Sequence, residues 1–185
     1  GYKVYTTIDQ RLQKHARNVM RSAIDRRFGP NGPDAAIVMI EAKTGKIITM
    51  ASTHNYSKDA KFNLAGPSAA RQAGSTYKTF VLTAMIKAGV SPTTRYFSAS
   101  PIKVNGVNCA DEGVGSGTFK TYGGRGAGMQ TVASATTKSD NSVYVQMTCD
   151  IGPQAVYDTA RQMGIRSMVD NIDNHNLSLG LGGLN

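Results

Sequence analysis

The chain has 185 residues, of which 40% are apolar, and its 21 Lys and Arg outnumber its 12 Asp and Glu to give a formal net charge of +9. This length and apolar content suffice for a packed core, and no stretch approaches the roughly 20 consecutive apolar residues that cross a bilayer. Two cysteines are too few for a disulfide scaffold.

The positive charges gather early in the chain. They lie on one predicted helix, at Arg11, Lys14, Arg17, Arg21, Arg26 and Arg27. A basic surface favours anionic partners, but a solvated helix face is the simpler interpretation. The sequence has neither zinc-finger spacing nor the aromatic and basic strand pattern of single-stranded nucleic-acid binders, so we do not expect a nucleic-acid partner.

The N-terminal region predicts a helix followed by a hairpin. The helix runs from Thr7 to Arg27, with Thr7 and Gln10 at capping-box spacing. The proline- and glycine-rich stretch "FGPNGP" ends it. Two β-branched, apolar runs of strand length follow, at Ala35–Ile40 and Lys46–Met50, and the turn "EAKTG" between them predicts a hairpin.

The remaining chain predicts a mostly helical region with a glycine-rich centre. A second helix runs from about Ser75 to Ala88, and its apolar stretch "FVLTAMI" indicates burial on all sides. Residues 90–129 predict loops with short strands. Helical pattern returns at 141–148, and again from Pro153 to Gly164.

The glycine-rich centre does not form a phosphate-binding loop. Such a loop ends in Gly-Lys-Ser or Gly-Lys-Thr, so that the lysine reaches the phosphates. In "GVGSGTFKT" two residues separate Gly117 from Lys120, and "TGKI" has isoleucine where the hydroxyl belongs. The sequence therefore does not predict nucleotide binding.

Ser75 and Lys78 form the first candidate catalytic pair. They stand three residues apart at the start of the predicted buried helix, so they share one face. Serine needs a neighbouring base to become a nucleophile, and a lysine kept from water can lose its proton near neutral pH. The same spacing recurs at Ser100 and Lys103, but the β-branched, glycine-broken residues that follow do not predict a helix there.

Ser139-Asp140-Asn141 is the second candidate box. It lies at the start of another predicted helix, downstream of Ser75. Ser139 could relay a proton to a leaving amine, and Asn141 could bind a substrate amide. Ser, Asp and Asn are also preferred helix caps, which is the structural alternative. The two boxes together, in this order and both at helix starts, favour the catalytic interpretation.

These boxes and their surroundings resemble the transpeptidase domain of penicillin-binding proteins. The similarity extends over "VYTTIDQRLQ", "AAIVMIEAKTGKIITMAS", "RQAGSTYKTFVLTAMIKAG" and "TVASATTKSDNSVYVQM", in the family's order. The lead-in "RQAGSTYK" is more similar to the class A members. The resemblance implies an α/β (α+β) fold, in which a central antiparallel sheet is flanked by helices and joined to an all-helical subdomain.

The resemblance also implies the chemistry. Ser75 would attack the penultimate D-Ala of a peptidoglycan stem peptide ending in D-Ala-D-Ala, and an amine from a neighbouring stem would resolve the acyl-enzyme. Lys78 would be the base, Ser139 the proton relay and Asn141 the substrate-binding amide, without a metal or organic cofactor. β-Lactams would acylate the same Ser75. The enzyme would be extracytoplasmic, tethered to the cytoplasmic membrane in the full-length protein.

One departure from the family concerns the Lys-Thr-Gly box, which follows the Ser-x-Asn box in the family. This chain has no lysine after Asn141, and its Lys43-Thr44-Gly45 precedes the nucleophile in the predicted hairpin turn. We therefore expect residues 1–185 to be the N-terminal part of a transpeptidase domain, with another segment supplying the box. Residues 1–90 would hold the helix, hairpin and nucleophile helix, and residues 91–185 a loop-rich, helical subdomain.

Several alternatives on this scaffold stay open. A D,D-carboxypeptidase differs only in using water as the acceptor, and a β-lactam-sensing or wall-binding module would keep the fold without turnover. Class A β-lactamases deacylate with a glutamate after the Ser-Asp-Asn box, whereas Glu41 and Glu112 both precede it here. Cys109 and Cys149 are consistent either with one bridge in an exported protein or with two unrelated thiols.

Overall fold

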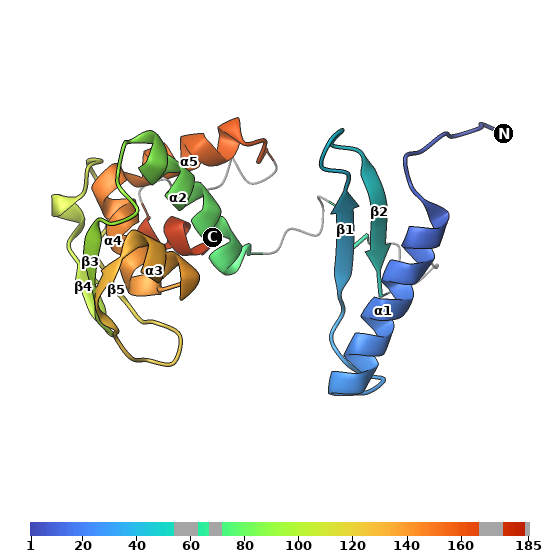
Figure 1. Ribbon diagram of the computed structural model, residues 1–185, viewed down its shortest axis with the longest axis horizontal. Helices are drawn as coiled ribbons and strands as arrows, with labels where there is room; N and C mark the ends of the chain where they lie inside the picture. The colour runs from blue at the N-terminus through green and yellow to red at the C-terminus, as the bar shows by residue number, and fades with distance from the viewer. Residues whose placement is uncertain (54–62, 67–71, 167–175, 184–185) are drawn as a thin grey trace. The chain divides into compact units, whose positions relative to one another are not determined.

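The computed structural model describes residues 1–53, 63–66, 72–166 and 176–183 of the chain (Figure 1). Two compact units make up the chain, residues 1–70 and residues 71–185. No helix in the described parts combines the length and the apolar character that crossing a bilayer requires. The Ser75 and Ser139 motifs both belong to the second unit.

The first unit is a β-hairpin with one long helix packed against it. Its elements are α1 (Gln10–Phe28), β1 (Ala36–Ile40) and β2 (Ile47–Ser52). The strands pair antiparallel, with Val38 opposite Met50, so the predicted hairpin is confirmed. Ala16 and Met20 of α1 pack against Ala51 of β2. Removal of these apolar side chains from water holds the helix on the hairpin.

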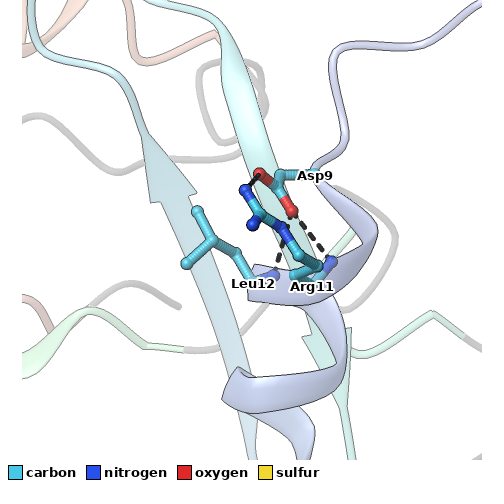
Figure 2. A network of polar contacts seen from close by, with 3 residues as sticks. All are labelled: Asp9, Arg11 and Leu12. Atoms are coloured by element: carbon cyan, nitrogen blue, oxygen red, sulfur yellow. Dashed lines mark hydrogen bonds and ion pairs between the residues drawn. The ribbon is translucent and has the colours of Figure 1, made fainter.

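The start of α1 differs from the sequence prediction. The capping box expected from Thr7 and Gln10 is wrong, because α1 begins at Gln10 and Asp9 is its N-cap (Figure 2). One Asp9 carboxylate oxygen accepts hydrogen bonds from the backbone N–H groups of Arg11 (2.8 Å) and Leu12 (3.2 Å). Both bonds lower the pKa of the Asp9 carboxyl, and the bond from Leu12 makes the larger contribution. The Thr7 hydroxyl instead donates to a carbonyl of β2 at 2.5 Å, since aspartate already satisfies the free N–H groups.

Lys43-Thr44-Gly45 lies in the turn between β1 and β2, as predicted. Gly45 has a φ of 71°, which glycine adopts without steric cost. The Thr44 hydroxyl donates to the carboxylate of Glu41, and Lys43 is exposed. The hydrogen bonds of this tripeptide therefore serve the hairpin turn itself.

The second unit is built on helices that share one core. They are α2 (Lys78–Lys87), α3 (Val132–Thr137), α4 (Asn141–Ile151) and α5 (Pro153–Gln162). Val81 of α2, Val143 of α4 and Val156 of α5 are fully buried in this core. The stretch predicted to be buried on all sides is buried on only part of its surface, because Ile86 is 58% exposed.

Short strands and turns complete the second unit. Two antiparallel pairs form, β3 (Arg95–Ser98) with β6 (Gly128–Thr131) and β4 (Ile102–Val104) with β5 (Gly117–Phe119). Two 3-10 turns, η3 (Gly106–Asn108) and η5 (Leu177–Leu181), contact α4. The loops and short strands predicted for this region are confirmed. Lys103 lies in β4 and Ser100 precedes it, so no helix holds this second pair together.

Cys109 and Cys149 form a disulfide, which decides the question that the sequence left open. Their sulfur atoms are 2.03 Å apart and their Cα atoms 4.5 Å apart. Cys149 lies in the last turns of α4, and Cys109 directly follows η3. The bridge therefore ties the β4–β5 connection to the C-terminal part of α4.

Candidate active site

Ser75 lies in η2 (Gly74–Tyr77), a 3-10 turn that continues directly into α2. In such a turn the side chains at positions i and i+3 are eclipsed, so Ser75 and Lys78 project the same way. Both border one cavity of about 240 Å³, whose other lining residues are Thr79, Leu82, Thr136, Ser139 and Tyr144. Ser75 is exposed, whereas Lys78 is only 4% exposed. An exposed hydroxyl and an amine withdrawn from water therefore line the same cavity.

The Lys78 side chain joins both candidate boxes. Its Nζ donates hydrogen bonds to the Ser139 carbonyl oxygen (2.6 Å), to the Ser139 Oγ (3.0 Å) and to the Asn141 Oδ1 (2.7 Å). An ammonium group carries three hydrogens, so these contacts use all of its donors. The structure thus brings Lys78, Ser139 and Asn141 together as the sequence predicted, with Ser75 on the same cavity.

Burial sets the proton affinity of Lys78. It lowers the pKa of the amine from its usual 10.5 to about 8, although the negative charge of Asp140 acts in the opposite direction. Water no longer stabilises the charged form, so the neutral amine becomes accessible near physiological pH. At pH 7 a group with this pKa is neutral in about one molecule in ten.

A sharp turn between α3 and α4 presents the second box. Ser139 has a φ of 53°, and it is the only non-glycine residue with positive φ in the described part of the chain. Strained backbone of this kind gathers at functional sites. Asp140 is the N-cap of α4, and its carboxylate accepts from the N–H groups of Ser142 (2.9 Å) and Val143 (3.3 Å). The capping residue thus lies between Ser139 and Asn141, the two residues that accept hydrogen bonds from Lys78.

Both ends of the Asn141 amide are held. Its Oδ1 accepts from Lys78, and its Nδ2 donates to the Lys120 carbonyl, just beyond β5, at 3.1 Å. This pair of bonds assigns the orientation of the amide, because only the nitrogen can donate. The second hydrogen of Nδ2 meets no acceptor among the described residues.

Sequence reasoning missed Tyr144, which forms one wall of the cavity. Its ring centroid lies 5.1 Å from Lys78 Nζ, and its hydroxyl shares a 2.8 Å hydrogen bond with Thr136 Oγ1. A cation over an aromatic face is attracted to the ring. Its position three residues after Asn141, on the same face of α4, was the signal that could have identified it. Within the described ranges, no cluster of three His, Cys, Asp or Glu side chains is arranged to hold a metal ion.

Comparison with known proteins agrees with this geometry. The sequence model described as the penicillin binding protein transpeptidase domain matches residues 35–180. Penicillin-binding protein 1A of Mycobacterium tuberculosis is 31% identical over 183 residues, which cover 96% of this chain and 20% of that protein. Peptidoglycan D,D-transpeptidase PbpA of the same species is 28% identical over 192 residues, covering 90% and 36%. The chain thus spans about a fifth to a third of these relatives.

Solved structures show the same fold. Penicillin-binding protein A from M. tuberculosis, as an imipenem acyl-enzyme complex, matches with a TM-score of 0.72 and 21% identity, over 96% of this chain and 47% of that one. Penicillin-binding protein 1A from Haemophilus influenzae matches with a TM-score of 0.67 and 20% identity, over 82% and 21%. The expected fold class is confirmed. With a family model that covers most of its length, the chain belongs to the penicillin-binding protein transpeptidase family.

Proposed function

We propose that this protein is a D,D-transpeptidase that cross-links peptidoglycan stem peptides through an acyl-enzyme on Ser75. The observation that carries the proposal is the position of Lys78 Nζ. It contacts both Ser139 Oγ and Asn141 Oδ1 and borders the same cavity as Ser75. The proposed nucleophile, base and second hydroxyl therefore line one cavity, and the proposed substrate-binding amide of Asn141 contacts the base, an arrangement suited to acyl transfer.

The proposed reaction has two steps. In the first, the neutral Lys78 amine takes the Ser75 proton while Ser75 Oγ bonds to the carbonyl carbon of the penultimate D-Ala. The amide C–N bond breaks, and the proton taken up by Lys78 passes through the Ser139 hydroxyl to the departing D-Ala amine. In the second step, the amine of a neighbouring stem attacks the ester carbonyl and gives up a proton to Lys78. The ester C–O bond breaks, and Lys78 returns that proton to Ser75 Oγ. Asn141 Nδ2 donates to an amide carbonyl of the bound stem throughout.

β-Lactams fit the first step of the same reaction. Ser75 Oγ would bond to the carbonyl carbon of the strained ring amide and break its C–N bond. The freed amine would remain attached to the acyl group through the rest of the ring. One of the structural relatives is described as an imipenem acyl-enzyme complex. We propose the same covalent product on Ser75, with the drug amide directed toward Asn141.

The disulfide supports an extracytoplasmic location. Disulfides form and persist in oxidising compartments and are rare in the cytosol, and Cys109 and Cys149 are bridged here. The relatives named as peptidoglycan transpeptidases also act on the cell wall. We propose that the full-length protein works at the outer face of the cytoplasmic membrane, to which it is anchored.

Intact-mass analysis of the full-length protein after incubation with benzylpenicillin tests the nucleophile. We expect one adduct of the drug's mass, absent in Ser75→Ala. Ser100→Ala is the matched control, because Ser100 has the same spacing to a lysine yet accepts a hydrogen bond from the Thr121 N–H (3.1 Å) outside the cavity. An adduct that survives Ser75→Ala would refute the proposed mechanism.

Product analysis separates the alternatives on this scaffold. A transpeptidase given stem peptides and an acceptor amine yields cross-linked dimers, whereas a D,D-carboxypeptidase yields only the trimmed stem and free D-Ala. A β-lactamase releases hydrolysed drug at many turnovers per molecule. A sensing module retains the adduct and forms neither product. Cross-linked dimers that disappear in Ser75→Ala are the expected result.

A further inference from the structure

Two buried hydroxyl groups, those of Ser98 and Ser142, hold the buried carboxylate of Asp140. Ser98, Asp140 and Ser142 are 2%, 7% and 0% exposed. Asp140 Oδ2 accepts the Ser98 hydroxyl at 2.5 Å, and Oδ1 accepts the Ser142 hydroxyl at 2.7 Å. With the backbone N–H groups of Ser142 and Val143, four donors satisfy this carboxylate. We call Ser98, Asp140 and Ser142 the carboxylate cluster.

The carboxylate cluster joins elements that are separate in the sequence. Ser98 is the last residue of β3, and its Oγ also accepts from the backbone N–H of Ala127 (3.0 Å), which precedes β6. Asp140 stands between the two residues that bind Lys78, namely Ser139 and Asn141. Asp140 thus links the β3–β6 pair to Ser139 and Asn141, which accept hydrogen bonds from the Lys78 ammonium group.

We propose that Asp140 is a positioning residue for the acylation step: held by Ser98 and Ser142, it fixes the turn that presents Ser139 and Asn141 to Lys78. This inference rests on the proposed transpeptidase function. Asp140 does not line the cavity, so it acts through its neighbours. A turn with positive φ at Ser139 is costly for a residue with a side chain, and the cluster supplies the contacts that maintain it.

The charge of Asp140 gives its positioning role a measurable effect on the pH dependence of acylation. Burial alone would raise the pKa of this carboxyl, but the hydrogen bonds from Ser98, Ser142 and the Val143 and Ser142 N–H groups outweigh it and lower the pKa. The carboxylate therefore stays ionised and favours the ammonium form of Lys78. Two titratable groups face Lys78 among the described residues, Asp140 and Tyr144. The Tyr144 phenol remains neutral, because burial raises its pKa.

The first test removes a hydrogen bond and keeps the charge. In Ser98→Ala the carboxylate loses one donor and the Ala127 N–H loses its acceptor. We expect the benzylpenicillin acylation rate of the full-length protein to fall roughly tenfold, as for the loss of one buried hydrogen bond. The pH at which the rate is half-maximal should stay unchanged, because the charge remains. Ser22→Ala, exposed on α1, is the matched control and should react like wild type.

The second test removes the charge and keeps the cap. Asn caps helices about as well as Asp, so Asp140→Asn retains the bonds from the backbone N–H groups. Lys78 then loses its proton more readily, and the rising limb of the acylation rate should move to lower pH. The ratio of variant to wild-type rate should be greater at about pH 6 than at about pH 9. Asp158→Asn, on the exposed face of α5, should leave the profile in place.

The acylation rate is determined only from molecules that form the Ser75-dependent adduct, so unfolded molecules do not contribute. A Ser98→Ala rate equal to that of Ser22→Ala would overturn the positioning role, whether or not Asp140→Asn folds. The positioning role would also be overturned if the acylation rate of Asp140→Asn and its dependence on pH both matched those of wild type. If wild type forms no Ser75-dependent adduct, the proposed function itself fails, and the role of Asp140 fails with it.

Discussion

Lys78 Nζ and Asn141 Oδ1 lie 2.7 Å apart, although 63 positions separate the two residues in the chain. This contact joins the start of α2 to the start of α4. It also fixes the Asn141 amide so that its nitrogen faces away from Lys78, toward the Lys120 carbonyl. One hydrogen bond therefore links the proposed base to the proposed substrate-binding amide.

Lys78→Arg should abolish acylation without removing the positive charge. The guanidinium group stays protonated at every accessible pH, so it cannot accept the Ser75 proton. We expect the rate of β-lactam acylation to fall by at least about 10²-fold, the usual contribution of a general base. Stopped-flow acylation of the full-length protein measures this. Lys87→Arg, exposed at the end of the same helix, should react at the wild-type rate.

The wild-type acylation rate should rise with pH through about 8. In the proposed reaction the neutral form of Lys78 is the base, and burial lowers the pKa of Lys78 to about 8. Below this pH the rate should fall about tenfold for each pH unit, because the neutral fraction falls tenfold. A rate that is flat between about pH 6 and pH 9 would contradict the role of Lys78 as base.

Tyr77→Phe should stabilise the protein. Tyr77 is 2% exposed, and its hydroxyl has no hydrogen-bond partner among the described residues. Removal of an unpaired buried hydroxyl should raise the free energy of unfolding by about 1 kcal/mol. Urea denaturation at neutral pH measures the change. Tyr122→Phe, at a fully exposed position, should leave stability unchanged.

The gain from Tyr77→Phe should increase in alkaline solution. Burial raises the pKa of the Tyr77 phenol from 10.0 to about 12, with a smaller contribution from Tyr157. Between these values the unfolded chain releases the phenol proton and the folded protein keeps it, so wild-type stability falls as pH rises. The phenylalanine variant lacks this loss. A difference between the two proteins that is constant from neutral pH to about pH 11 would contradict the prediction.

The disulfide should contribute substantially to stability. Cys109 and Cys149 are 40 positions apart, and closing a loop of this size in the unfolded chain contributes about 2–4 kcal/mol. The Cys109→Ala/Cys149→Ala double variant should lose this amount in urea denaturation. Dithiothreitol should lower the stability of wild type toward that of the double variant and leave the double variant unaffected. Equal stability of the two oxidised proteins would contradict the prediction.

Gly182→Ala should disturb the turn that carries Ser75. Gly182 has a φ of 71°, and a Cβ there would lie 2.2 Å from the Gly74 carbonyl oxygen. The clash adds to the backbone cost of positive φ, so we expect a loss of more than about 2 kcal/mol in the free energy of unfolding. Acylation of Ser75 should also slow, because η5 and η2 contact each other at this point.

Gly123→Ala separates the two effects of that substitution. Gly123 has a φ of 82°, but a Cβ there meets nothing within 4 Å. This variant should lose only about 1 kcal/mol, from backbone conformation alone, and should acylate at the wild-type rate. Equal losses in the two glycine variants would show that close packing of Gly182 on Gly74 is unimportant.

Local sequence pattern predicted the elements well where periodicity and breakers agree. β-Branched, apolar runs of strand length on either side of "EAKTG" predicted the hairpin of β1 and β2, and Pro153 marked the first turn of α5. Prediction failed at the start of α1: Thr7 and Asp9 both suit a helix start, but Asp9 caps the helix and the Thr7 hydroxyl donates to a carbonyl of β2. Side chains near helix ends thus find partners that are close in space but far away in the sequence.

The sequence by itself determined which residues could react, because serine, lysine and asparagine carry their chemistry with them and helix spacing aligns Ser75 with Lys78. Tertiary structure alone decided the rest. The neutral form of Lys78 is accessible because burial withdraws the amine from water, and the Asn141 amide is oriented by a carbonyl beyond β5. Desolvation and hydrogen-bond direction arise from contacts between distant segments, so no local pattern encodes them.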